Sequence, residues 1–378
     1  MTAAGAHPRD ASDDEIADWD DRAVRSPGGH VYQSTVWAAQ RARIGWQPRF
    51  VMLDDEHPAL VLLRSFPIVG GASAYVPRGP VVDARDEGDQ RDGGDRAAER
   101  VNALANWLVE AGVVVVATDA EVPASDAAYG TRLRRLGFHP IAEIQPSRHR
   151  VSVSLAEGTD DEGVRAVFTK STRQRIAGAE RDGVIVERHD TGGSVASDLF
   201  EQPKAAPREA FEAFATLLEG TGQRRGFRFG PRDVFIDWWL AALEAGMLVY
   251  LDARDGSDPS RSLGGLILYR HGTRLSTVHS ADPPGVRETH PGVMHLLRWR
   301  AIQLAIREGC DEMDLGGVDS APEHAEPGEG HPMAGLYEHK RSFGAHWVAM
   351  TGAHERVMRP SRYSLGRVAA RLDRLVAR

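Results

Sequence analysis

Lysine is almost missing from this sequence of 378 residues. Arginine carries nearly all of the positive charge, and lysine stands only at Lys170, Lys204 and Lys340. A lysine ammonium is a compact donor on a flexible stem, whereas arginine presents a rigid planar fork. A point donor suits an oxyanion that forms transiently on a carbonyl, so Lys340 is a candidate catalytic residue, with a solvated surface lysine as the plain alternative.

Cysteine and long apolar runs are scarce as well. Cys310 is the single cysteine, which excludes an internal disulfide and a multi-cysteine metal site. No apolar run approaches the roughly 20 residues that a membrane-spanning helix needs, and the acidic first 21 residues lack the apolar core of a secretory signal. We expect a cytoplasmic protein that is large enough for two domains.

The net charge of -8 argues against a protein coated in basic surface for nucleic acid. A nucleic-acid partner would need a local patch, because phosphate contacts come from clustered Lys and Arg. One candidate patch comprises Lys170, Arg173, Arg175 and Arg181, of which helical spacing places the first, second and fourth along one side. A second comprises Arg224, Arg225, Arg228 and Arg232, interleaved with two phenylalanines. The alternative for each is a solvated face paired with acidic residues.

The last twenty residues form a third basic stretch. Arginines alternate with leucine and valine at near-helical spacing from Arg359 to Arg378. Such a pattern is typical of a helix that lies on an anionic membrane surface, although an amphipathic helix docked on its own protein is more common. Peripheral contact at the inner face of the membrane is therefore a minority hypothesis.

Apolar periodicity predicts alternating helices and strands, arranged as two similar α/β halves. In the first half we expect helices at 14–25, 35–43 and 96–111 and strands at 49–53, 59–66, 113–118 and 150–154. In the second half we expect helices at 161–182, 210–219, 231–245 and 292–308 and strands at 184–188, 248–253, 262–270, 273–280 and 312–315.

Two motifs flank a loop rich in Pro, Gly, His and Glu near the C-terminus. The first is Asp314-Leu315-Gly316-Gly317, and the second is the run Leu336-Tyr337-Glu338-His339-Lys340-Arg341-Ser342-Phe343-Gly344. Together they resemble the DLGG strand end and the LY-x-FK-x-x-FG segment of the Fem family of peptidoglycan bridge aminoacyltransferases.

Other motifs of that family occur in the same order along nearly the whole chain. Tyr75-Val76-Pro77-Arg78-Gly79-Pro80-Val81 is similar to its Y-x-x-(R/K)-G-P-V element, and Asp119 stands at the position of an acidic residue after a strand. The N-terminal Gln33 and Trp37 region and the basic run from Lys170 to Ile176 are also similar to family segments.

The resemblance implies a pair of N-acetyltransferase-like (GNAT-like) domains, each a mixed sheet flanked by helices, with no coiled-coil arm. We expect residues 1–155 and 352–378 to form the domain on the cell-wall precursor side. Residues 156–351 would form the domain that holds the acyl donor and the catalytic lysine.

The resemblance also implies transfer of an amino acid from aminoacyl-tRNA to the stem peptide of a peptidoglycan precursor. The donor ester is already activated, so no cofactor and no metal is expected, and aminoacyl-tRNA serves as co-substrate. Lys340 would stabilise the oxyanion. The amine must lose a proton to His339, Asp119 or the tRNA ribose hydroxyl, and the sequence does not choose among them. The family usually carries Phe at the position of His339, so this residue is either an acid-base group or, as we favour, part of an aromatic wall.

For the precursor, the resemblance points to a set of binding residues in several elements. Arginine forks suit diphosphate or carboxylate groups, and Asp119 suits an ammonium group. The predicted contacts are Arg41, Arg78, Asp119, Arg224, Tyr337 and His279. Gly230, Val234, Thr277 and His279 replace the Arg and Tyr residues that an armless member uses for a nucleotide-linked precursor, which favours a lipid-linked or altered precursor.

Two other classes of function remain open. A coenzyme A-dependent N-acyltransferase on the same fold would need a pyrophosphate loop that opens a helix, and the sequence shows no such loop. A non-catalytic protein that binds tRNA or the precursor would not need Lys340. A metal site built from His324, His331, Glu323, Glu326 and Glu329 is less favoured, because these residues fit a hydrated lid over Lys340 better.

Overall fold

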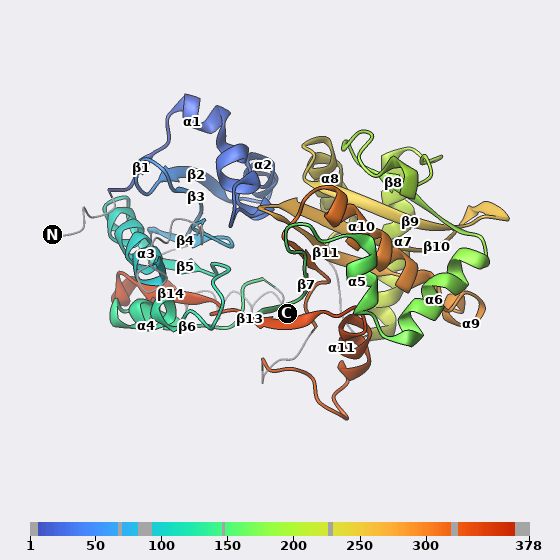
Figure 1. Cartoon of the computed structure of the whole chain (residues 1–378). Coiled ribbons are helices and arrows are strands. Elements are labelled where there is room, and N and C mark those ends of the chain that lie inside the picture. The colour runs from blue at the N-terminus through green and yellow to red at the C-terminus, as the bar shows by residue number, and fades with distance from the viewer. Residues whose placement is uncertain are drawn as a thin grey trace. The chain divides into compact units, whose positions relative to one another are not determined.

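The computed structural model describes residues 7–66, 70–81, 93–145, 148–225, 230–318 and 324–366. The chain divides into two compact units, Met1–Arg148 with Ala349–Arg378 and His149–Val348. Each unit is built on a seven-stranded mixed sheet with helices packed against it (Figure 1). This architecture confirms the predicted α/β class, and each unit is described here by itself.

The first unit has the strand order β1-β2-β3-β4-β5-β14-β6. All neighbouring strands in this sheet are antiparallel except β4 and β5. Its elements are β1 (Arg9–Asp10), α1 (Asp13–Ala17), η1 (Asp21–Arg25), η2 (Val31–Gln33), α2 (Thr35–Arg43), β2 (Gln47–Met52), β3 (Pro58–Ser65), β4 (Ala72–Val76), α3 (Gly93–Glu110), β5 (Val113–Thr118), α4 (Ala127–Arg135), β6 (His139–Pro140) and β14 (His354–Val357).

One face of this sheet is covered by α3. Val101, Leu104, Ala105 and Leu108 follow helical spacing and are fully buried in a cluster with strand residues such as Val116. An apolar stripe with this period turns one side of a helix toward the core. The burial of these residues explains why α3 forms although its first turn contains two glycines.

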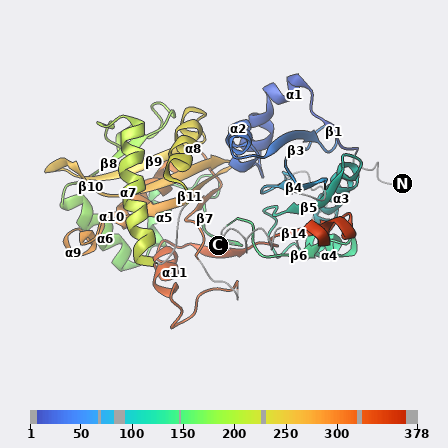
Figure 2. The same ribbon diagram turned by 180° about the vertical axis from the view of Figure 1, so that it is seen from behind.

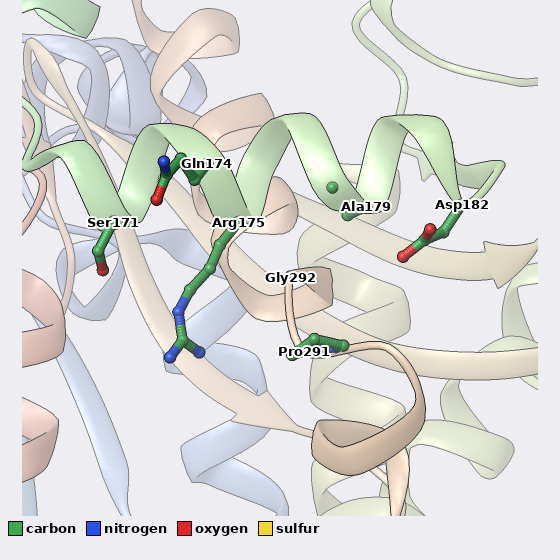
Figure 3. Close-up of a pocket in the computed structure, with 8 residues that line it drawn as sticks. Ser171, Gln174, Arg175, Ala179, Asp182, Pro291 and Gly292 are labelled. Carbon is green, nitrogen blue, oxygen red and sulfur yellow. The ribbon is translucent and has the colours of Figure 1, made fainter.

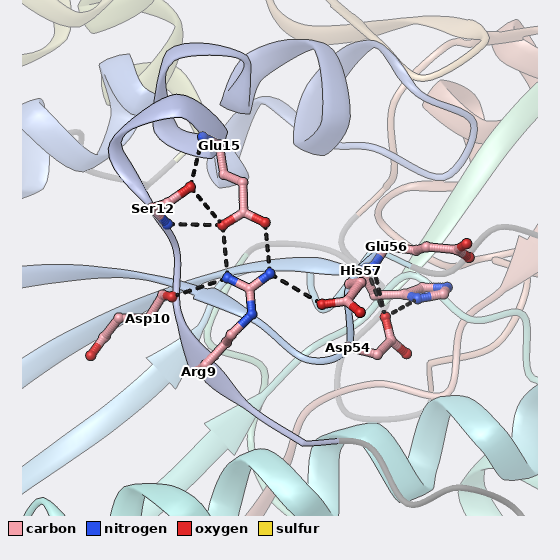
Figure 4. Close-up of polar contacts among 8 residues, drawn as sticks. Arg9, Asp10, Ser12, Glu15, Asp54, Glu56 and His57 are labelled. Carbon is pink, nitrogen blue, oxygen red and sulfur yellow. Dashed lines mark hydrogen bonds and ion pairs between the residues drawn. The ribbon is translucent and has the colours of Figure 1, made fainter.

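The start of the chain is fixed to the sheet by polar contacts (Figure 4). Ser12 and Glu15 form a capping box at the N-terminus of α1. Both guanidinium nitrogens of Arg9 donate to the Glu15 carboxylate at 2.8 Å, and one also donates to Asp55 at 3.2 Å. These side chains are partly exposed, so the contacts orient the chain more than they stabilise it.

The second unit has the strand order β13-β7-β12-β11-β10-β9-β8, in which β11 and β12 are parallel. Its elements are β7 (His149–Ser154), α5 (Asp161–Ala166), α6 (Lys170–Arg181), β8 (Val184–His189), η3 (Ser197–Leu199), α7 (Pro207–Arg225), α8 (Arg232–Glu244), β9 (Leu248–Asp255), β10 (Asp258–His271), β11 (Arg274–Ala281), α9 (Val286–Thr289), α10 (Val293–Arg307), β12 (Glu312–Asp314), α11 (Ala334–Arg341) and β13 (His346–Ala349).

Helices α10 and α7 cover opposite faces of this sheet, as the front and back views show (Figures 1 and 2). Alternate residues of β9 explain the arrangement. Val249 and Leu251 are buried in the cluster that contains α10, whereas the Tyr250 ring lies 5.1–5.6 Å from the rings of Phe211 and Phe214 on α7. The central strands are therefore buried on both sides.

Three of the predicted elements differ in the structure. The strand predicted at 150–154 is β7, which pairs with β12 in the second sheet instead of the first. The helix predicted at 161–182 is broken into α5 and α6, because Thr169 is extended and its side chain accepts a hydrogen bond from the backbone of Thr172, which starts a new helix. Residues 14–25 are likewise split between α1 and η1.

Candidate functional site

Lys340 lies on α11 and is almost completely buried, with 3% of its surface exposed. Its Nζ donates to the carbonyl oxygens of Gly316 at 2.5 Å and Gly317 at 2.7 Å. The structure therefore excludes the alternative of a solvated surface lysine. A buried ammonium is stabilised only where hydrogen-bond acceptors replace its hydration, and the turn after β12 supplies two of them.

This turn begins where two parallel strands part. The pairing of β11 with β12 ends at Ser276 and Asp314, although Leu315 still donates to Val151 on β7. Nearby in β11, the register against β10 shifts so that Val278 is an extra, bulged residue between Thr277 and His279. The parting strands and the bulge leave a break in the sheet, and the Gly316–Gly317 turn that binds Lys340 lies at this break.

Gly316 is required in this turn for two reasons. Its φ of +81° lies in the left-handed region. A Cβ at this position would also lie only 2.7 Å from the carbonyl oxygen of Thr277. Both conditions favour glycine, so the turn can approach β11 and Lys340 closely only without a side chain at 316.

His339, the other predicted catalytic residue, packs in an aromatic environment. Its ring lies 4.4 Å from that of His295 and 5.5 Å from that of Phe343. Burial lowers the pKa of His339 far below its usual range, and Arg298, His295 and Lys340 act in the same direction. A ring that stays neutral and binds a proton so weakly is a poor general base, which favours the aromatic-wall interpretation.

Tyr337 and His279 were both predicted to bind substrate. The Tyr337 hydroxyl donates to Glu326 at 2.7 Å, so its polar atom is engaged within the protein. His279, on β11, lies beside Phe235 and Trp239 of α8 at ring distances of 6.0 and 5.7 Å. Burial lowers the pKa of His279 to about 4, so this ring is neutral near pH 7.

In the first unit, the Asp119 carboxylate follows β5 and holds the segment that carries Arg78. One oxygen accepts from the backbone N–H of Arg78 at 2.6 Å, and the other accepts from the Tyr75 hydroxyl at 2.9 Å. The Arg78 guanidinium lies 3.8 Å from Asp119 and 3.9 Å from Glu121. Asp119 is 2% exposed, and its contacts are those of a group that fixes Arg78 at its φ of +51°.

A series of contacts links Arg41 to Arg78. The Arg41 guanidinium lies 3.8 Å over the Trp37 ring, and Trp37 stacks on Tyr32 at 4.3 Å. Tyr32 then contacts His30, and His30 faces Glu121 at 3.9 Å. The sequence prediction missed Tyr32, His30 and Glu121. A sequence gives the order of these residues but does not reveal which side chains come into contact.

The predicted tRNA-binding residues lie on α6, but they do not act alike. Lys170, Arg175 and Arg181 are exposed, whereas the Arg173 guanidinium donates to the backbone oxygens of Phe168 and Ala166. Arg175 points into a pocket of about 360 Å³ (Figure 3). Pro291 and Gly292, which come directly before α10, also line this pocket. Arg173 therefore binds the C-terminal end of α5 and the link between α5 and α6, and it is not part of the exposed basic face.

Other predicted residues lie partly or wholly outside the described part of the chain. They include the side chains of Arg224 and Arg225, the whole of residue Arg228, and residues 367–378 of the tail. In the described part of the tail, Arg359 donates to the backbone of Val109 on α3. Among described residues, no helix has both the length and the apolar character to cross a membrane. No group of three metal-binding side chains is found there either, and Glu323 is not described.

Comparison with known proteins places this geometry in context. Residues 169–341 match the family model described as Acetyltransferase (GNAT) domain. None of the curated proteins that were compared matches the sequence.

Solved structures match over nearly the whole chain. The structure of FemX has 18% identity and a TM-score of 0.72, with 95% of this chain and 99% of FemX covered. L-PGS from Bacillus licheniformis has 12% identity and a TM-score of 0.50, with 95% and 97% covered. A conserved protein of unknown function from Bacteroides thetaiotaomicron VPI-5482 has 10% identity and a TM-score of 0.53, with 93% and 98% covered.

At these identities the structural matches establish the fold, and together with the family model they support an acyltransferase. The sequence motifs pointed to the same fold independently. The chain thus has the two-domain GNAT-type fold of the Fem-like proteins, which confirms the resemblance at that level.

Proposed function

We propose that this protein transfers an aminoacyl group from aminoacyl-tRNA to the stem-peptide amine of a peptidoglycan precursor. The observation that carries the proposal is the buried Lys340 ammonium, held by the Gly316–Gly317 turn at the break between β11 and β12. The fold shared with FemX and the ordered motifs support the same reaction.

In the proposed step, the neutral amine attacks the ester carbonyl carbon, and a C–N bond forms while negative charge moves to the carbonyl oxygen. The Lys340 ammonium would stabilise this charge in a site from which water is largely excluded. The ester C–O bond then breaks, and the ribose oxygen leaves with the proton that the amine gives up. No cofactor is required, because the ester is already activated.

Of the three proton acceptors considered, the contacts favour the tRNA ribose hydroxyl. Burial weakens His339 as a base, and both oxygens of Asp119 accept hydrogen bonds from Arg78 and Tyr75. In this proposal Asp119 positions Arg78, and Arg41 and Arg78 are the residues that bind the phosphate or carboxylate groups of the precursor.

The test is transfer of labelled amino acids from a mixed pool of charged tRNAs to lipid-linked and nucleotide-linked muropeptides. Lys340→Met keeps the length of the side chain but removes its charge, and Lys204→Met alters an exposed lysine as the matched control. We expect a loss of about 100-fold or more for Lys340→Met and no change for Lys204→Met. Full activity of a folded Lys340→Met variant would remove Lys340 from the mechanism.

A coenzyme A-dependent acyltransferase is the second candidate, because the family model that matches residues 169–341 is that of an acetyltransferase domain. The same assay therefore includes acetyl coenzyme A and a set of amine acceptors. Acetyl transfer in the absence of aminoacyl transfer would favour this second candidate.

A further inference from the structure

Asp314 is the last residue of β12 and lies directly before the turn that holds Lys340. Its side chain is largely buried, and residue 314 is 8% exposed. The Oδ1 atom accepts a hydrogen bond from the backbone N–H of Gly316 at 2.8 Å. The carbonyl oxygen of the same glycine accepts the hydrogen bond from Lys340 Nζ. A single residue, Gly316, thus connects the two charged side chains.

Gly316 needs such an anchor more than another residue would. Glycine populates many backbone conformations, and a turn built on two consecutive glycines has little conformational preference of its own. A hydrogen bond to an ionised acceptor is about twice as strong as one between neutral groups. The Asp314 carboxylate can therefore select the one backbone conformation in which both glycine carbonyls reach Lys340.

The base of this anchor is rigid. Asp314 is paired with Ser276 on β11 and with Ser152 on β7, so strands lie on both of its sides. The preceding carboxylate on the same face, Glu312, is bound to Arg150 at 3.1 Å and to the Ser152 hydroxyl, and not to the turn. The two carboxylates of β12 therefore bind different partners, and Asp314 is the one that binds the turn.

We propose that Asp314 is a positioning residue, whose carboxylate fixes the Gly316–Gly317 turn and through it the location of the Lys340 ammonium. The catalytic consequence rests on the proposed function, but the positioning itself does not. The two statements can therefore be tested separately.

The positioning is measured by nuclear magnetic resonance on protein with isotope-labelled lysine, since only three lysines give signals. We expect the Lys340 ammonium protons to exchange with water at least about tenfold more slowly than those of the exposed Lys170 and Lys204. Asp314→Leu, which keeps the branched shape of the side chain but has no acceptor, should bring Lys340 to the exchange rate of the other two lysines. Asp314→Asn should raise the exchange rate several-fold, because its acceptor is neutral.

Glu312→Leu is the matched control and should leave the Lys340 exchange rate unchanged. An unchanged rate in a folded Asp314→Leu variant would overturn the proposal. If that variant does not fold, an unchanged rate in Asp314→Asn overturns it instead.

Transfer activity is then measured on the same variants. We expect Asp314→Leu to lower kcat about tenfold or more with a KM for the donor within about threefold of the native value. Altered exchange with unaltered transfer would keep Asp314 as a positioning residue and contradict the role proposed for Lys340. Absence of transfer by the native chain would count against the proposed function alone.

Discussion

The two units each bury a cation, but they surround it differently. In the first unit, Arg78 lies near two carboxylates, Asp119 and Glu121, at 3.8 and 3.9 Å. In the second unit, Lys340 donates to two carbonyl oxygens that carry no formal charge. Carboxylates offset part of the charge of the cation that they face, whereas carbonyl oxygens solvate an ammonium group without a formal charge of their own. The difference suits Arg78 to binding with a defined orientation and Lys340 to stabilising a charge that forms during reaction.

The largest effect on stability is expected from Asp119→Ala in the first unit. The substitution removes the acceptor of the Arg78 backbone and leaves a buried guanidinium without its nearest carboxylate. Breaking a buried pair in this way costs about 3–5 kcal/mol, measurable by chemical denaturation. Glu121→Ala, which removes the more exposed of the two carboxylates, should cost about 1 kcal/mol. Equal losses for the two variants would contradict the anchoring role of Asp119.

Gly316→Ala should have the next largest effect, in the second unit. The left-handed φ and the approach to the Thr277 carbonyl oxygen both oppose a Cβ, so we expect a loss of about 2–3 kcal/mol in unfolding free energy. The control is Gly330→Ala, at a similar φ of +84° but with no atom within 4 Å of the added Cβ. This control should cost about 1 kcal/mol, and a loss as large as that at 316 would mean that φ alone explains the effect.

A smaller effect concerns acid stability and His279. Burial lowers the pKa of His279 from 6.5 to about 4, so the unfolded chain binds a proton between these pH values and the folded chain does not. The contribution of this residue to stability is therefore complete above pH 6.5 and is lost as the pH falls toward 4.

We therefore expect His279→Phe to reduce the loss of unfolding free energy between pH 7 and 4.5 by about 2 kcal/mol. Denaturant titrations at the two pH values measure this difference. His346→Phe changes an exposed histidine and serves as the control. An identical pH dependence of the native chain and His279→Phe would show that His279 is not buried in neutral form.

The smallest effect is expected from His339→Phe. The ring of His339 packs against His295 and Phe343, and burial keeps it neutral. If it is part of an aromatic wall, phenylalanine should keep transfer within about threefold of the native rate, with an unaltered pH profile. A loss of tenfold or more, together with a changed pH profile, would restore His339 as an acid-base group.

The sequence predicted the two-domain fold and singled out Lys340 because both depend on local, ordered patterns. Lysine is rare in this chain, and the glycines of the turn stand next to each other. The strand β7 was assigned to the wrong sheet because an apolar run does not reveal its pairing partner. The break before α6 had a local signal, the Thr169 cap, which the continuous helical pattern masked.

Contacts between distant residues could not be predicted in this way. Asp119 and the Arg78 backbone are 41 positions apart, and Tyr32, His30 and Glu121 join one cluster only in the folded unit. Asp119 was therefore predicted to bind an ammonium group of the substrate, whereas its contacts are with Arg78 and Tyr75. The role of the site residues in binding substrate stays a prediction.

In the proposed reaction, Lys340 provides a buried positive charge for aminoacyl transfer. The most direct test compares the initial rate of transfer from charged tRNA to muropeptide acceptors for the native chain, Lys340→Met and Lys204→Met. We expect a rate about 100-fold or more lower for folded Lys340→Met and a native rate for Lys204→Met. Native transfer by folded Lys340→Met would rule out this role for Lys340.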